Sequence, residues 1–216
     1  MHDKSGRIKQ VQQVPQAPPS AINWPAGMRR LAILPVDAVR PVNETQRDMD
    51  GVFRGELSKV VKYEIVQVSR PEMMKLINRE SISSTEVLPQ HLVTALRQKY
   101  AANAVMFIDF TLFRPYRPMA IGVRAKIVDL SNMEILWMAD GVLDAAEPDV
   151  AALASQFADS SLKMGYISPT IPKGQTRDYA SGNQIVLQSP RLFAMFVAHE
   201  AFASLAPPPP PPVTNR

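Results

Sequence analysis

Apolar residues recur along the chain in short strand-like runs and longer helical stripes, whereas both ends are polar or rich in proline. Residues 28–36 (MRRLAILPV) contain a continuous apolar run, which predicts a strand covered on both faces and ended by Pro35. In residues 43–61 the apolar positions repeat at helical spacing and predict a long helix. Residues 63–68 (YEIVQV) alternate and are rich in β-forming residues, so they predict a second strand.

A helix is expected directly after this second strand, because residues 69–72 (SRPE) have the form of a capping box. It should run to about residue 79, and another helix is expected over residues 89–101. Three strands then follow in quick succession, at residues 104–113, 119–130 and 133–143. The middle strand alternates apolar with charged residues, which predicts an antiparallel meander with one solvated face.

Two more helices are expected, at residues 148–164 and from residue 190 to about residue 206. Ser189 is the expected cap of the last helix, with Pro190 in its first turn. The resulting order, β-α-β-α-α-β-β-β-α-α, predicts an α/β (α+β-like) fold built on a mixed sheet of about five strands. The first two strands should be parallel through a helical crossover and the last three antiparallel, with helices packed on the sheet. The expected organisation is a proline- and glutamine-rich tether at residues 1–25, one globular domain at 26–206 and a polyproline tail at 207–216.

Composition narrows the possible chemistry. The 216 residues contain no cysteine, which excludes disulfide frameworks, thiolate zinc sites, iron–sulfur clusters and cysteine nucleophiles. The three histidines are far apart, so we expect neither a metal site nor a cofactor. The net charge of +4 is small and the basic residues are dispersed, so nucleic acid is not an expected partner. The sequence has no apolar run of about 18 residues, so no transmembrane helix is expected.

No sequence motif points to catalysis. The chain lacks a nucleophile elbow, a phosphate-binding loop, a dinucleotide fingerprint and a zinc-protease motif, so we do not expect an enzyme. Asp37 ends the first strand, where α/β enzymes place ligand groups, but an aspartate there is commonly a turn or cap residue. Asp109 interrupts an apolar strand, and we interpret it as a structural residue on the solvated face of the pleat.

The hairpin between the third and fourth expected strands and the last helix are the candidate partner-binding segments. Arg114, Tyr116 and Arg117 lie at the hairpin tip, and arginine and tyrosine are enriched in protein interfaces. A rigid proline-containing turn and a stacking site for single-stranded nucleic acid are the alternatives.

The last helix is too apolar for an ordinary surface helix. Its candidate partner-binding residues are Phe193, Phe196 and Phe202, which lie on more than one face of the helix. The helix is therefore either wedged into the domain or bound to a partner, and the sequence leaves both possibilities open.

Four segments, taken in order, resemble one known family. They are residues 31–45 (LAILPVDAVRPVNET), 68–80 (VSRPEMMKLINRE), 99–110 (KYAANAVMFIDF) and 123–137 (VRAKIVDLSNMEILW). Together they are similar to the curli-export (CsgG-like) lipoprotein superfamily. That superfamily includes flagellar outer-membrane accessory lipoproteins, lipoprotein activators of cell-wall synthases and the amino-terminal domain of the Tol-system propeller protein.

The resemblance covers about residues 30–145 and implies a non-catalytic bacterial envelope protein. It implies an assembly or accessory subunit of a secretion, flagellar or other outer-membrane machine, in the periplasm and anchored at the outer membrane. A signal peptide and a lipidated cysteine would have preceded the present N-terminus, and membrane contact would occur only through that lipid. The implied partners are other envelope proteins and further copies in a homo-oligomer or ring, with no nucleic acid.

The sequence departs from the superfamily in two places. Asn132 and Met133 replace the glycine of the last hairpin. The two long membrane-inserting hairpins of the curli exporter have no counterpart, so a pore is not implied. Two alternatives stay open, namely a periplasmic regulator of a cell-wall synthase and a cytosolic nucleotide-binding α/β protein.

Overall fold

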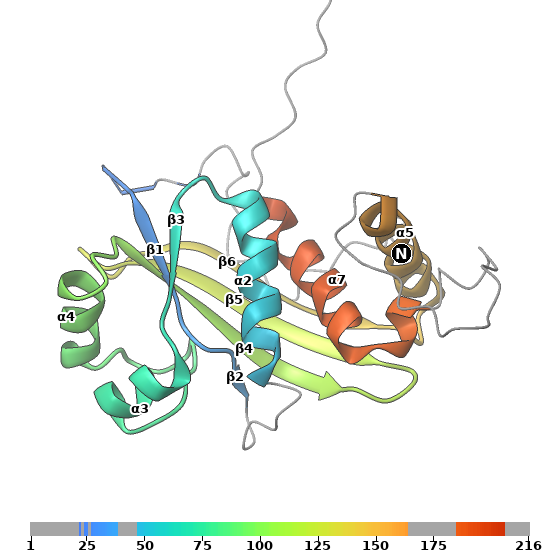
Figure 1. Ribbon diagram of the computed structural model, residues 1–216, viewed down its shortest axis with the longest axis horizontal. Coiled ribbons are helices and arrows are strands. Elements are labelled where there is room, and N and C mark those ends of the chain that lie inside the picture. Colours follow the sequence, from blue (N-terminus) through green and yellow to red (C-terminus); the bar gives the residue numbers. More distant parts are fainter. Residues whose placement is uncertain (1–21, 23, 26, 39–46, 164–184, 206–216) are drawn as a thin grey trace, which may run out of the picture.

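The protein is described here from a computed structural model, which places a mixed sheet beneath and between its helices (Figure 1). The described residues are 22, 24–25, 27–38, 47–163 and 185–205. Nearly all of the expected tether and the whole of the expected polyproline tail lie outside them, so the predicted domain boundaries stay predictions.

The sheet has six strands in the order β3-β1-β4-β5-β6, with β2 paired to β4. The strands are β1 (Arg30–Ile33), β2 (Asp37–Ala38), β3 (Glu64–Gln67), β4 (Ala104–Arg114), β5 (Ala120–Asp129) and β6 (Ile135–Asp144). β1 is parallel to both β3 and β4, and β4, β5 and β6 are antiparallel. The predicted mixed sheet is therefore confirmed. Only the short β2, which directly follows the first apolar run, was not predicted.

The longer helices are α2 (Met49–Val60), α3 (Arg70–Ile77), α4 (Gln90–Gln98), α5 (Pro148–Lys163) and α7 (Pro190–Phe202). Single 3-10 turns, η3 (Val186–Gln188) and η4 (Ala203–Leu205), flank α7. Serine caps start two of the helices as predicted. The hydroxyl of Ser69 accepts a hydrogen bond from the Glu72 amide, and that of Ser189 accepts one from the Leu192 amide.

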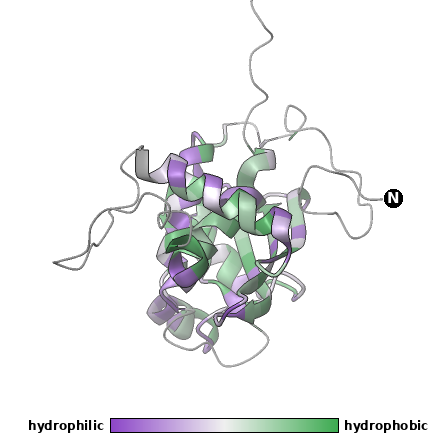
Figure 2. Ribbon diagram, turned by 90° about the vertical axis from the view of Figure 1, so that its right-hand side faces the viewer, coloured by the Kyte–Doolittle hydropathy of each residue, from purple (hydrophilic) through white to green (hydrophobic). Residues whose placement is uncertain are grey.

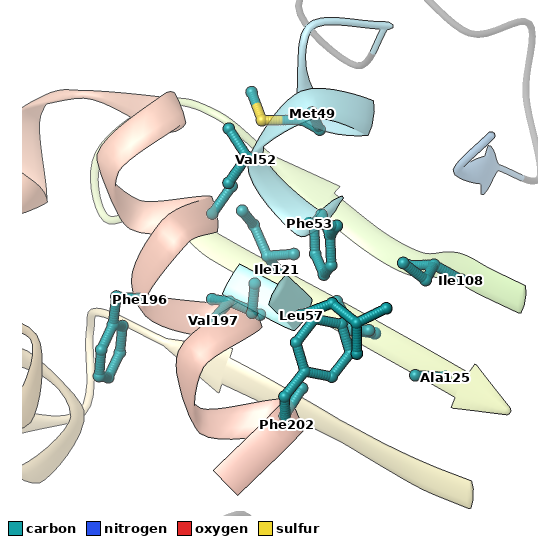
Figure 3. Close-up of a cluster of buried hydrophobic side chains, with 14 of the residues drawn as sticks. Met49, Val52, Phe53, Leu57, Ile108, Ile121, Ala125, Phe196, Val197 and Phe202 are labelled. Carbon is teal, nitrogen blue, oxygen red and sulfur yellow. The ribbon is translucent and has the colours of Figure 1, made fainter. Parts of the chain in front are cut away.

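The main hydrophobic core lies between one face of the sheet and helices α2, α5 and α7. Figure 1 shows α2 and α7 side by side across the strands, and Figure 3 shows their side chains meeting above β4 and β5. Phe53 of α2 links these layers, because its ring lies 5.7 Å from that of Phe110 and 6.0 Å from that of Phe202 between centroids. Edge-to-face aromatic pairs of this kind hold the two helices to the sheet.

The last helix belongs to this core. Phe193, Phe196 and Phe202 are all fully buried. This corrects the expectation that they form a partner-binding surface, because they leave no exposed area for a partner. Of the two possibilities that the sequence left open, the structure shows the helix wedged into the domain, where α2, α5 and the sheet surround its apolar faces.

A second, smaller core lies on the opposite face of the sheet. It joins α3, α4 and the chain that connects them to the ends of β1, β4 and β5. The sequence predicted that one face of the β4–β5–β6 meander is exposed to solvent, but α3, α4 and their connection cover part of that face. Because α3 and α4 lie at the opposite end of the molecule from the β4–β5 hairpin, no described helix covers the half of this face near the hairpin (Figure 1).

Helices α2, α3, α4 and α5 are amphipathic, whereas α7 is apolar over most of its surface. In the view of Figure 2, hydrophilic and hydrophobic positions are interspersed along the helices, as expected for helices packed on a sheet. Among the residues that the structure describes, no helix has the length and apolar character needed to cross a membrane.

The burial of Phe202 gives a test of this arrangement. We expect Phe202→Ala to lower the free energy of unfolding by about 3–5 kcal/mol, because it removes a ring packed against Phe53 and Trp137 and leaves a cavity. Urea denaturation measures the change. Val87→Ala, at a side chain that is 91% exposed, should change it by no more than about 0.5 kcal/mol. An equally small change in the free energy of unfolding for Phe202→Ala would contradict the burial of Phe202.

Candidate protein-interaction site

Two aspartates lie together beyond the carboxyl end of β1. Asp37 of β2 is the direct neighbour of Asp109 of β4 in the sheet. The hydroxyl of Ser81 donates a hydrogen bond to Asp37 at 2.6 Å. The backbone amide of Ser84 donates to Asp109 at 3.0 Å, and the Ser84 hydroxyl donates to it at 2.5 Å. Both carboxylates thus bind the segment between α3 and α4.

This polar cluster anchors a loop. Asp109 is only 6% exposed, which corrects its expected position on a solvated face, because the loop at residues 81–86 folds over it. Lys126 of β5 donates to the backbone carbonyl of Ser84 from the other side. Burial lowers the pKa of Lys126, and the nearby charge of Asp109 opposes that shift. The donors and acceptors satisfy one another, as buried polar groups in proteins generally do.

Other titratable groups give no metal site. Within the described part of the chain, no group of three or more histidine, cysteine, aspartate or glutamate side chains is placed to hold a metal ion. The most buried ion pair, Arg70 with Asp50, joins α3 to α2, and Arg70 also donates to the Val36 carbonyl at 2.9 Å. This pair holds the elements around the end of β1 together.

The three hairpin-tip residues lie together, but they have different roles. Arg114 donates from Nε to the Pro118 carbonyl at 2.7 Å and from Nη2 to both oxygens of Asp144, at 2.7 and 2.8 Å. It therefore fixes the hairpin and joins it to the end of β6. Tyr116 is 80% exposed, and Arg117 is also exposed. The structure thus presents an aromatic and a cationic side chain on a turn that Arg114 links to the end of β6.

A β-bulge next to the tip was not predicted. The register of β4 against β5 shifts between Phe110 and Leu112, so that Thr111 is the extra residue. Gly122 lies opposite, and a Cβ there would come within 2.4 Å of the Thr111 hydroxyl oxygen. The glycine inside an otherwise alternating strand was the available sequence signal.

The bulge directs a row of side chains to the open part of the second sheet face. Leu112 is 40% exposed and Val142 is 53% exposed, and they flank Gly122 on the neighbouring strands. Charged pairs border this apolar row on each side. They are Arg114 with Asp144, and Arg124 with Asp140 at 2.6 Å. We call this surface the hairpin face; it consists of Leu112, Arg114, Gly122, Arg124, Asp140, Val142 and Asp144.

Comparisons with known proteins give distant structural similarities. No protein-family model and no curated protein sequence matches the chain. The lipoprotein GNA1162 of Neisseria meningitidis is 14% identical, with a TM-score of 0.45, over 64% of this chain and 99% of that one. The PelC dodecamer of Paraburkholderia phytofirmans is 11% identical, with a TM-score of 0.40, over 58% and 79%. The LpoB C-terminal domain of Salmonella enterica is 14% identical, with a TM-score of 0.35, over 53% and 81%.

These similarities are too distant to transfer a property to this chain, because every TM-score is below 0.5. Two of the three proteins carry names that describe a lipoprotein or an oligomer, and those descriptions belong to them alone. The comparisons do not identify the CsgG-like superfamily, so the resemblance drawn from the sequence stays a prediction.

The loop anchor predicts a pH dependence. Burial raises the pKa of Asp37 above its ordinary value of 3.8, and the charge of Asp109 adds to this, against the hydrogen bond from Ser81. A carboxyl with a raised folded pKa contributes stability below pH 3.8 that is lost as the pH rises through the folded pKa. Asp37→Asn should therefore gain stability relative to the wild type as the pH rises above about 4.

Unfolding free energies measured by urea denaturation across this pH range test the expectation. Ser81→Ala removes the hydrogen bond that lowers the pKa of Asp37, so this variant should continue to lose stability to a higher pH than the wild type. If the unfolding free energies of the wild type and Asp37→Asn change with pH in parallel, the raised pKa of Asp37 is contradicted.

Proposed function

We propose that this protein is a non-catalytic accessory subunit of a bacterial envelope machine and acts by binding other proteins. The observation that carries the proposal is the exposure of Tyr116 on a hairpin that Arg114 braces through bonds to the Pro118 carbonyl and to Asp144. A binding group that is already rigid loses less conformational entropy on association, so a fixed aromatic tip favours a protein interface. Arg117 beside it adds a cation suited to an acidic partner surface.

The arrangement of Asp37 and Asp109 supports the non-catalytic part of the proposal. In a nucleotide-binding α/β protein, polar groups at the carboxyl ends of the strands face the ligand. Here both carboxylates accept hydrogen bonds from serines of the loop at residues 81–86. That use of the two carboxylates favours a binding protein over the cytosolic nucleotide-binding alternative.

The sequence resemblance supports the envelope location. It suggests a periplasmic position with a lipid anchor at the outer membrane, and a secretion or flagellar machine as the assembly served. A regulator of a cell-wall synthase would use the same kind of surface. The two possibilities differ in the identity of the partner, so identifying that partner distinguishes them.

Site-specific photo-crosslinking tests the proposal. A benzoylphenylalanine in place of Tyr116, in the organism that encodes the protein, should give adducts with an envelope protein that mass spectrometry can identify. The same group in place of Val87, which is exposed on a loop outside the hairpin, is the control and should give no such adduct. Arg117→Ala should reduce the yield of the adduct about tenfold, as expected for a residue at the centre of an interface.

Adducts at both positions in equal yield would show random collision and would overturn the role of the tip. Adducts only with cytosolic proteins would overturn the envelope location. A cell-wall synthase as the partner would select the regulator, and a secretion or flagellar component would select the assembly subunit.

A further inference from the structure

The hairpin face has a distribution of charge and apolar surface that complements itself. Its basic groups lie on β4 and β5, in Arg114 and Arg124, and its acidic groups lie on β6, in Asp140 and Asp144. An exposed leucine and an exposed valine occupy the row between these pairs. A face that is positive along one side and negative along the other can meet its own copy after a half-turn.

The sheet register shows which half-turn fits. β5 lies between β4 and β6, and Gly122 lies on β5 between Leu112 and Val142. A two-fold axis parallel to the strands and above Gly122 exchanges β4 with β6 in the facing copy. Leu112 of each copy then lies over Val142 of the other, which creates the same apolar contact twice.

The same axis brings together the charged residues at the hairpin end of the two faces. Arg114 of each copy lies over Asp144 of the other, so two ion pairs become one network of two arginines and two aspartates. At the centre, Gly122 has no side chain, and the Thr111 hydroxyl lies above it. Two such hydroxyls meet at the axis and can hydrogen-bond to each other. Arg124 faces its own counterpart, but each Arg124 already has Asp140 at 2.6 Å.

We propose that the hairpin face binds a second copy of this chain, sheet against sheet, about a two-fold axis over Gly122. The inference goes beyond the proposed function, because a pair of this kind forms in the purified protein without any machine. The contact covers three strands and three side-chain rows, less than the roughly 800 Å² per partner of a standard interface. We therefore expect a weak dimer with a Kd of roughly 10 µM to 1 mM.

Sedimentation equilibrium of the full chain at about 10 µM to 1 mM tests the proposal. The wild type should shift from monomer to dimer across this range. Val142→Lys and Leu112→Lys should each weaken the dimer at least about tenfold, because each places an ammonium group over an apolar partner. Val87→Lys, at an exposed apolar residue outside the hairpin face, should leave the Kd unchanged. Unchanged thermal unfolding of these surface variants shows that the fold is intact.

A pair of oppositely charged substitutions tests which residues face each other in the proposed dimer. In the proposed dimer residue 112 faces residue 142 of the other copy, so Leu112→Lys combined with Val142→Glu should regain association that either single variant lacks. A wild type that stays monomeric at every concentration overturns the proposal. A dimer that Val142→Lys does not weaken overturns it as well, and failure of the double variant to regain association excludes this two-fold arrangement. Loss of the Tyr116 crosslink to an envelope protein would not affect any of these results.

Discussion

The fold depends on the double burial of strand β4. Its residues 104–110 are all buried, because the main core covers one face and the smaller core covers the other. The same strand pairs in parallel with β1 and β2 and antiparallel with β5. Every layer of the molecule is therefore positioned by contact with β4 or with a strand that β4 positions. A polar side chain within this stretch can be accommodated only with full hydrogen bonding.

Asp109 shows how that requirement shapes the surface. Its carboxylate is buried in the middle of β4, and the serines at residues 83 and 84 satisfy it. This fixes the loop between α3 and α4 at one end of the second sheet face. Beyond Asp109 the strand bulges at Thr111 and leaves the smaller core, while Phe110 and Phe113 still pack in the main core. The change from a fully covered strand to an exposed hairpin, over a few residues, separates the structural part of the sheet from the part available for binding.

The order and type of the main elements could be predicted from local patterns. The alternation of β5, the serine–proline starts of α3 and α7 and the apolar run of β1 are each determined by neighbouring residues, and the structure confirms them. The location of the hairpin-tip residues was predicted, whereas their role in binding a partner stays a prediction. Arg114, Tyr116 and Arg117 do lie together at a hairpin tip. That Arg114 mainly fixes the turn could not be predicted, because its partner Asp144 is 30 residues away.

The sequence by itself determined the mixed sheet and its crossover, because strand and helix periodicity depend only on residues a few positions apart. Tertiary structure alone decided which apolar surfaces are free. The phenylalanines of α7 were equally compatible with a core and with an interface, and only the packing of α2 and α5 around them placed them in the core. Conversely, Leu112 and Val142 resemble core residues in the sequence. They are exposed because α3 and α4 cover the other half of the sheet, a placement that no local pattern specifies.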